Sequence, residues 1–216
     1  MTHATLRFEP LGDRALLIRL GDRIDPAIHR AVGRLATAIR AAALDGITEV
    51  VPTYTTVGVW YDPIRRPYAD LVEQLSHLRV PQQADSDAKG RDWTIPTRYD
   101  GPDLGEVANR LGTTPAQVIE RHASRTYSVY LLGFVPGFAF LGELDPALVL
   151  PRRDTPRRRV PAGSVAIAGA QTGIYPLSTP GGWHLIGRTK LRLFDPSREP
   201  AALLDVGDRV RFDPVR

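Results

Sequence analysis

The segment between Gly133 and Thr189 constrains the fold of this chain more than any other part of the sequence. Glycine, proline, aromatic residues and arginine occur there at a density that a hydrophobic core does not require. Glycine permits positive φ and close approach of the backbone to a ligand, whereas proline fixes φ and removes a hydrogen-bond donor. Such a composition between short apolar runs predicts shaped loops on a β scaffold. Binding groups commonly lie on loops of this kind, so the segment is the first place to expect a functional site.

The first 81 residues predict a small α+β sandwich. Strand-like runs at residues 6–8 and 15–20 precede a helix that Asp25 caps, with Pro26 at the first helical position. Residues 50–61 return to β-branched and aromatic side chains and predict one further strand, and a second helix follows it. This β-β-α-β-α order favours a ferredoxin-like arrangement.

Residues 82–91 contain no large apolar side chain and predict a linker. Residues 92–216 predict a second domain, a β barrel with helices at its entrance. One of these helices begins at Thr114, and Gln117 three residues later completes a capping box, in which each side chain bonds the other's backbone. The final pattern, at residues 206–212, predicts a turn that leads into an edge or closing strand.

The composition narrows the class of protein. Of the 216 residues, 43% are hydrophobic and 24% are charged, which is ordinary for a globular chain. The net charge of +4 is spread among interspersed acidic residues, so we expect no nucleic-acid partner. We also expect no membrane partner, because the apolar runs are too short to span a bilayer. With no secretory signal at the start of the sequence, a cytoplasmic protein is expected.

Several kinds of catalytic chemistry are absent from the sequence. The chain has no cysteine, which excludes disulfides, thiolate metal sites and cysteine nucleophiles. Its five histidines are scattered, so no metal site is expected. It contains neither a P-loop nor a G-x-S-x-G nucleophile elbow. The chain is therefore not expected to be an enzyme that works by itself.

One cluster of basic residues stands out in the loop-rich segment, at Arg152, Arg153, Arg157, Arg158 and Arg159. We expect Arg153, Arg158 and Arg159 to be solvated. Arg152 and Arg157 differ because each follows a proline in a repeated Pro-Arg pair. A planar guanidinium matches carboxylate or phosphate geometry, so these two are candidate anion-binding residues.

The strongest single candidate is the run Pro-Gly-Gly-Trp-His at residues 180–184. Gly181 and Gly182 expose backbone N–H groups that can form an anion-binding nest or an oxyanion hole. Trp183 is then a pocket wall and His184 a hydrogen-bonding group. The alternative is a tight turn that closes a hairpin, with Trp183 capping the barrel. Arg188, four residues further on, is placed to bind a carboxylate with two hydrogen bonds.

Four more residues are candidates, each with a structural alternative. His122, near the end of the capped helix, either gains from the helix dipole or faces the pocket as a proton-transfer group. Phe138 is expected to be an aromatic wall, although core packing is the commoner fate of phenylalanine. Gln171 and Tyr175 supply an amide and a phenol that can orient a small polar ligand, or Tyr175 is a core residue with a satisfied hydroxyl.

The chain resembles the allophanate hydrolase subunit 1 family in the collinear runs GFVPGFAFLG, VPAGSVAIAG, QTGIYP and PGGWHLIGRT and in the two Pro-Arg pairs. This carboxyltransferase-domain family includes subunits of 5-oxoprolinases and an inhibitor of a sporulation histidine kinase. The resemblance implies a cyclophilin-like barrel for residues 92–216 and places a histidine at His122. Thr179 stands where serine is more usual in the family, and His184 where glutamine is common.

The resemblance implies a hydrolase subunit that acts on a cyclic amide, opening 5-oxo-L-proline to L-glutamate with ATP bound by or shared with a partner. The implied partners are a homologous second subunit, of the kind known as allophanate hydrolase subunit 2 or the C-type subunit of 5-oxoprolinase, and a third subunit with further catalytic machinery. Two alternatives stay open: a subunit of the allophanate hydrolase or urea carboxylase type, and a regulatory inhibitor of a histidine kinase. A deep pocket lined by Gln171, Tyr175, Trp183 and Arg188 favours the enzyme subunit, and an exposed apolar patch without a polar pocket favours the inhibitor.

Overall fold

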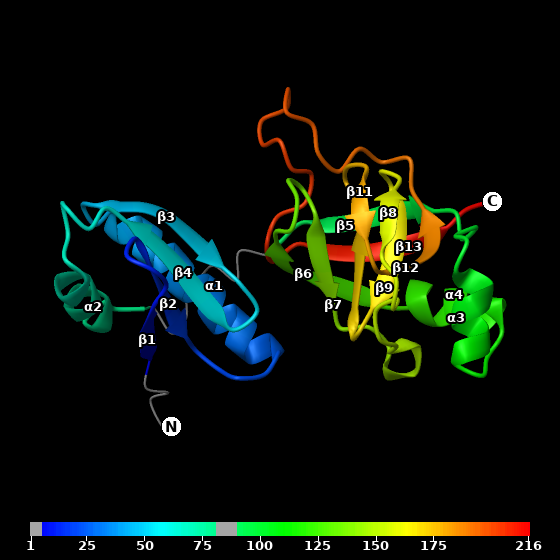
Figure 1. Cartoon of the computed structure of the whole chain (residues 1–216), viewed down its shortest axis with the longest axis horizontal. Coiled ribbons are helices and arrows are strands. Elements are labelled where there is room, and N and C mark those ends of the chain that lie inside the picture. The colour runs from blue at the N-terminus through cyan, green and yellow to red at the C-terminus, as the bar shows by residue number, and fades with distance from the viewer. Residues whose placement is uncertain (1–5, 81–89) are drawn as a thin grey trace. The chain divides into compact units, whose positions relative to one another are not determined.

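A computed structural model describes residues 6–80 and 90–216, which belong to two compact units, Met1–Ala88 and Lys89–Arg216 (Figure 1). Almost all of the predicted linker, residues 82–91, lies outside the described residues. Within the described ranges no helix has both the length and the apolar character that crossing a bilayer requires.

The N-terminal unit contains a four-stranded antiparallel sheet and two helices (Figure 1). Two hairpins are joined through their inner strands, which gives the sheet order β1-β2-β4-β3. The elements in chain order are β1 (Arg7–Pro10), β2 (Ala15–Arg19), α1 (Pro26–Ala42), β3 (Ile47–Pro52), β4 (Thr56–Tyr61) and α2 (Tyr68–Ser76).

The single strand predicted at residues 50–61 is wrong, because the chain reverses direction between β3 and β4. The backbone N–H of Thr53 donates to the carbonyl of Thr56 over 2.8 Å, which closes this turn. The Thr53 hydroxyl also lies 2.8 Å from that of Thr56. The resulting ββαββα order differs from the βαββαβ order of a ferredoxin-like fold, so the ferredoxin-like prediction is not confirmed.

Helix α1 begins where the sequence predicts it. The Asp25 carboxylate accepts from the backbone N–H groups of Ala27 at 2.7 Å and Ile28 at 3.3 Å, two groups that lack a partner inside the helix. One face of the helix then buries Val32, Leu35, Ala36 and Ile39 against the sheet. The other core side chains of this unit are Leu16, Ile18, Val50, Val57, Val59, Tyr61, Leu71 and Leu75.

The C-terminal unit, called the barrel unit below, is a nearly closed barrel of mixed parallel and antiparallel strands (Figure 1). Its seven-stranded sheet has the order β12-β9-β10-β7-β6-β13-β5, and β8 and β11 form a separate pair. The elements are β5 (Asp92–Thr97), α3 (Leu104–Arg110), α4 (Pro115–Ala123), β6 (Thr126–Leu132), β7 (Ala139–Gly142), η1 (Pro146–Leu148), β8 (Arg157–Val160), β9 (Ser164–Ala168), β10 (Gln171–Ile174), β11 (Thr179–Gly181), β12 (His184–Arg188) and β13 (Arg209–Pro214).

The two end strands of the sheet, β5 and β12, meet at a single bridge. Arg98 and Arg188 exchange two backbone hydrogen bonds of 2.8 Å. The chain then continues alongside β12, where the N–H of Asp103 donates to the carbonyl of Leu185 at 3.0 Å. Gly101 makes this approach possible, because a Cβ there would overlap the backbone of β12. The bridge therefore places Asp103 beside the start of β12.

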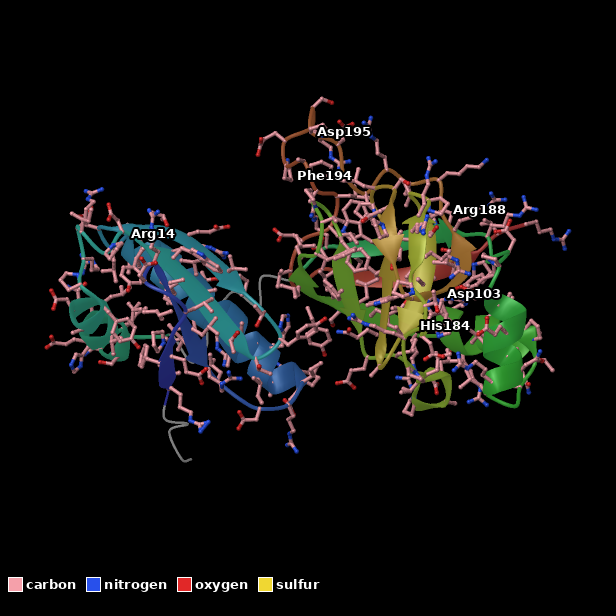
Figure 2. The ribbon with its side chains drawn as sticks, in the orientation of Figure 1. Arg14, Asp103, His184, Arg188, Phe194 and Asp195 are labelled. Atoms are coloured by element: carbon pink, nitrogen blue, oxygen red, sulfur yellow. The ribbon has the colours of Figure 1, made fainter. Side chains whose placement is uncertain are left out.

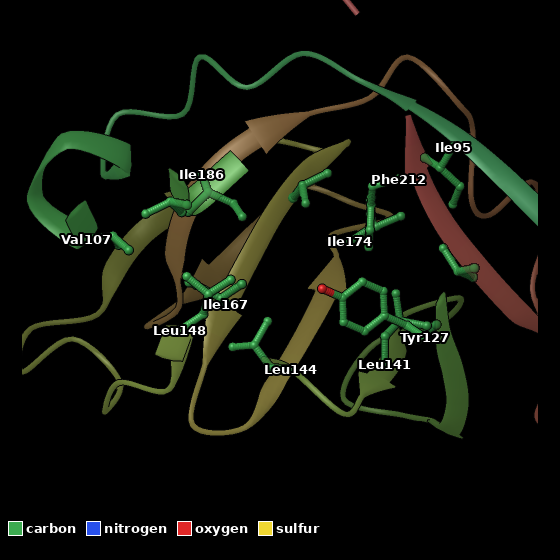
Figure 3. Packing of buried hydrophobic residues seen from close by; sticks show 14 of the residues in the cluster. Ile95, Val107, Tyr127, Leu141, Leu144, Leu148, Ile167, Ile174, Ile186 and Phe212 are labelled. Atoms are coloured by element: carbon green, nitrogen blue, oxygen red, sulfur yellow. The ribbon is translucent and has the colours of Figure 1, made fainter. Parts of the chain in front are cut away.

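Strand β9 divides the apolar residues of the barrel unit between two clusters. Val165 and Ile167 point into the barrel, whose interior Figure 3 shows. Ala166 and Ala168 point the other way, as alternation along a strand requires, and belong to an outer cluster. The outer cluster consists of Phe138, Val160, Ala166, Ala168, Tyr175, Trp183 and Leu185.

Two local features of the barrel unit can be compared with the sequence prediction: the start of α4 and the position of the last strand. The capping box at the start of α4 is confirmed: Gln117 N–H donates to the Thr114 hydroxyl at 3.2 Å, and the Gln117 side chain accepts from Thr114 N–H at 3.1 Å. The final strand, β13, is not at an edge. It lies between β6, to which it is antiparallel, and β5, to which it is parallel.

Candidate functional site

A cluster of charged side chains lies where the chain before α3 meets the start of β12. Figure 2 shows Asp103 and His184 at this end of β12, with Arg188 toward its other end. Asp103 is the N-cap residue of α3, but its carboxylate does not cap that helix. It accepts instead from the backbone N–H of Leu185 at 2.7 Å. The carboxylate is thus directed at β12 rather than at its own helix.

Two arginines from the loop-rich segment complete the surroundings of Asp103. Arg153 Nη1 lies 3.0 Å from Asp103 Oδ1, and Arg157 Nη2 lies 2.5 Å from the same oxygen. Arg153 Nη1 also reaches Glu106 Oε2 at 3.1 Å. The Asp103 side chain is 3% exposed, whereas each arginine side chain is 26% exposed. A carboxylate buried to this degree requires such pairing, and the guanidiniums lie at the boundary with solvent.

Three buried nitrogen atoms of this region have no hydrogen-bond partner among the described residues: Arg153 Nε, Arg157 Nη1 and His184 Nδ1. Unpaired buried polar atoms are rare in folded proteins because each loses its bonds to water without replacement. Here they come from three residues that lie around one carboxylate and the strand beside it. We name Asp103, Arg153, Arg157 and His184 the Asp103 cluster.

His184 is fully buried, and the hydrogen bond of its ring determines which ring nitrogen carries the hydrogen. Its Nε2 lies 3.0 Å from the carbonyl oxygen of Pro151, which can only accept, so Nε2 carries the hydrogen. In the neutral ring Nδ1 then holds a lone pair. The Asp103 cluster therefore offers an acceptor from His184 and N–H donors from two arginines, a set that suits an anionic ligand with a donor group of its own.

The aromatic residues predicted as pocket walls form the outer cluster. Trp183 packs edge to face on Phe138 and Phe140, with ring centroids 5.6 and 5.8 Å apart. Phe138 also contacts Tyr175 at 5.2 Å, and both are almost fully buried. Phe138 is therefore packed between Trp183 and Tyr175.

Tyr175 links the outer cluster to the arginines. Burial raises the pKa of its hydroxyl, while a backbone hydrogen bond from Trp183 and the charges of Arg152 and Arg157 lower it. The hydroxyl occupies the space where Gly181 has no side chain, since a Cβ at Gly181 would overlap it.

Gly181 and Gly182 lie at the end of strand β11 and directly after it. Gly181 belongs to strand β11, where it pairs with Arg157 of β8. Neither glycine has positive φ, so the two do not form the anion-binding nest expected of them. The carbonyl of Gly182 accepts from the backbone N–H of Arg153 at 2.8 Å, and this bond brings the loop containing Arg153 to the cluster.

His122 lies inside the barrel, away from the Asp103 cluster. Its Nε2 is 2.8 Å from the Thr172 hydroxyl, which itself donates to the Ala166 carbonyl, so Nε2 is the protonated nitrogen. Its Nδ1 accepts from the Tyr99 hydroxyl at 2.7 Å. Burial lowers the pKa of His122 to about 3, and the ring is neutral at physiological pH. Two hydrogen bonds, to Tyr99 and Thr172, thus hold the His122 ring inside the barrel.

The two remaining predicted residues lie elsewhere on the barrel. Arg188 is at the far end of β12, about 13 Å along the strand from His184, and pairs with Asp100 at 2.7 Å. Gln171 opens β10 opposite Ala168, at the other end of that strand from Tyr175. The four residues expected to line one deep pocket, Gln171, Tyr175, Trp183 and Arg188, therefore do not converge.

Sequence analysis did not identify two residues of the Asp103 cluster as candidate site residues. Asp103 follows a proline at the start of a predicted helix, where an aspartate is ordinarily a cap. Arg153 was expected to be solvated, which is wrong because it bonds Asp103 and Glu106. Arg158 and Arg159 are exposed, as predicted. No spacing signal in the sequence connects Asp103 with arginines fifty residues later.

The family described as carboxyltransferase domain, subdomain C and D, matches residues 6–204. The chain belongs to this family, which confirms the predicted family.

Relatives of similar length carry a more specific name. The chain is 40% identical to the B-type subunit of 5-oxoprolinase from Bacillus subtilis (strain 168), covering 96% of this chain and 93% of the relative. It is 41% identical to the B-type subunit of 5-oxoprolinase from Escherichia coli O157:H7, covering 95% and 94%. The name of these relatives implies that they work beside other subunits.

Solved structures place the same fold within longer chains. The protein TTHA0988 is 45% identical over 94% of this chain, with a TM-score of 0.84, and this chain spans 40% of its length. The urea carboxylase of Kluyveromyces lactis shares the fold with a TM-score of 0.78 at 21% identity, over 98% of this chain and 22% of its own length.

Proposed function

We propose that this chain is one subunit of an ATP-dependent 5-oxoprolinase, which opens 5-oxo-L-proline to L-glutamate together with separate subunits. The proposal rests on identity of 40% and 41% over nearly full length to two proteins named as the B-type subunit of 5-oxoprolinase. The proposed partners are a C-type subunit of the same enzyme and a third subunit with further catalytic machinery. ATP is proposed to be bound by or shared with a partner, since the sequence has no P-loop.

The chemistry of the Asp103 cluster supports a role in binding the substrate. 5-Oxoproline presents a carboxylate, and Arg157 has one nitrogen bonded to Asp103 and a second, Nη1, without a partner among the described residues. A guanidinium held in place by one carboxylate is oriented to receive another on its free side.

The deciding experiment is release of glutamate from 5-oxoproline, measured with and without ATP. The chain is assayed alone and then after co-expression with the proposed partner subunits. Turnover that requires both the mixture and ATP supports the proposal. A purely regulatory inhibitor of a kinase gives no turnover in any mixture, and that result would contradict the proposal.

Replacing Arg157 with lysine is expected to lower kcat/KM for 5-oxoproline about 10- to 100-fold in the assembled enzyme, mainly through KM. Lysine preserves a cation for Asp103 but loses the two-pronged geometry, and a hydrogen bond between charged groups contributes about 1.5–3 kcal/mol. The matched control is Arg158→Lys on the next, exposed position of β8. Equal kcat/KM for the two variants would remove Arg157 from the substrate site.

A second candidate is a subunit of the allophanate hydrolase or urea carboxylase type. One observation favours it: the chain is 26% identical to urea amidolyase of Lachancea kluyveri over 96% of its length, although it spans 13% of that protein. The same preparations are therefore also assayed with urea, bicarbonate and ATP, and with allophanate. Consumption of these substrates without glutamate release from 5-oxoproline would favour the second candidate.

A further inference from the structure

One exposed phenylalanine lies on a backbone that few bulky residues adopt. The N–H of Val135 donates to the carbonyl of Gly133 at 2.9 Å, a three-residue turn centred on Phe134. Phe134 has φ of 71°, so this is the rare γ-turn with positive φ, which is strained for a side chain with a Cβ. Strain of this kind persists where the surroundings hold it, and it is concentrated at functional sites.

The loop around Phe134 is held by further bonds. Gly133 N–H donates to the Phe138 carbonyl at 3.1 Å, and Phe138 N–H donates to the Val135 carbonyl at 3.0 Å. Phe194 lies against the backbone at Gly137, leaving no room for a side chain there. The position of Phe134 is therefore fixed by the fold.

The Phe134 side chain itself is 61% exposed, and it is the exposed member of the six phenylalanines of the chain. Its ring rests edge-on against two aromatic residues of the outer cluster, with centroids 5.5 Å from Phe138 and 6.5 Å from Tyr175. One side of the ring is thus supported, and the rest is free to enter a cavity in another molecule.

We propose that Phe134 is the anchor by which this chain binds its partner subunit, entering an apolar pocket of that subunit. The inference rests on the proposed function, which supplies the partner. Two observations favour a protein as the occupant. The relatives are named as one subunit of several, and in TTHA0988 the part matched by this chain is 40% of one longer polypeptide. In addition, aromatic residues, phenylalanine among them, are enriched in the cores of protein interfaces.

The test uses the full chain and the co-expressed C-type subunit of 5-oxoprolinase, with binding measured by calorimetry. Phe134→Ala is expected to weaken the complex at least 30-fold, which corresponds to about 2 kcal/mol. Phe134→Tyr, which keeps the ring, is expected to bind within a few-fold of the unmodified chain. The matched control is Ile64→Ala, since Ile64 is 93% exposed in the N-terminal unit. Thermal unfolding of each variant verifies that it is folded.

The possible outcomes separate this inference from the proposed function. An unchanged Kd for Phe134→Ala, or no complex with the unmodified chain, overturns the inference. An unchanged Kd with a raised KM for 5-oxoproline also overturns it and makes Phe134 a ligand contact. Weakened binding by Phe134→Ala, in a complex that releases no glutamate, supports the inference while the proposed function fails.

Discussion

Replacing Asp103 with alanine is expected to lower the free energy of unfolding of the barrel unit by about 3–5 kcal/mol, the usual cost of removing one partner from a buried ion pair. The substitution leaves the Arg153 and Arg157 guanidiniums without their shared carboxylate. It also leaves the buried N–H of Leu185 without an acceptor. Urea unfolding followed by tryptophan fluorescence measures the loss. In a Trp60→Phe background the two remaining tryptophans, Trp93 and Trp183, report on the barrel unit alone.

The matched control for this measurement is Asp100→Ala. Asp100 also pairs with two arginines, Arg98 and Arg188, but their side chains are 58% and 62% exposed. Exposed ion pairs contribute at most about 1 kcal/mol, because water solvates the charges once the pair is broken. If Asp103→Ala lowers the free energy of unfolding no more than Asp100→Ala does, burial does not increase the contribution of the Asp103 ion pairs to stability.

Acidification is expected to destabilise the barrel unit through His122. Burial lowers the pKa of this histidine to about 3 in the folded state, against about 6.5 in the unfolded chain. Below pH 6.5 the unfolded state binds a proton that the folded state does not, so stability falls as the pH falls toward 3. The contribution from His122 is at most about 1.4 kcal/mol per pH unit, or about 2–3 kcal/mol between pH 6.5 and 4.5.

The variant His122→Gln isolates this contribution from that of other titrating groups. It is expected to be less stable than the unmodified protein at pH 7, because it disturbs the bonds to Tyr99 and Thr172. The difference should shrink as the pH falls from 6.5 to 4.5. His77→Gln, at an exposed position of the N-terminal unit, preserves His122 and serves as control. Parallel stability curves for His122→Gln and the unmodified protein would contradict the assigned pKa.

Sequence analysis predicted well the elements that local chemistry determines. Asp25 with Pro26 marks the start of α1, and Thr114 with Gln117 marks the start of α4, since each cap involves residues within three positions of one another. The turn between β3 and β4 was missed because the sequence between the two strands contains threonine and tyrosine, which are also good strand residues. A local pattern cannot separate one long strand from a hairpin in such a stretch.

The candidate site, by contrast, depends on contacts between residues that are far apart in the sequence. Sequence analysis named Arg157 and the run at residues 180–184 as candidates, and Arg157 and His184 belong to the Asp103 cluster. Their partner Asp103 is fifty or more positions away, and only closure of the barrel between β5 and β12 brings it to them. In the GFVPGFAFLG run sequence analysis singled out Phe138 rather than Phe134, because strain at the Phe134 backbone depends on bonds that no sequence motif specifies.

The position of β13 between β5 and β6 also has a consequence for folding during translation. Arg209 of this strand pairs with Asp92 of β5, which is 117 residues earlier. During translation β5 has no neighbour in its sheet, and β6 has an open edge, until residues 209–214 have been synthesised. The sheet of the N-terminal unit needs nothing after Tyr61. The nascent chain therefore carries one finished sheet and one with exposed edges for most of its synthesis, and its need for chaperones should be concentrated in the barrel unit.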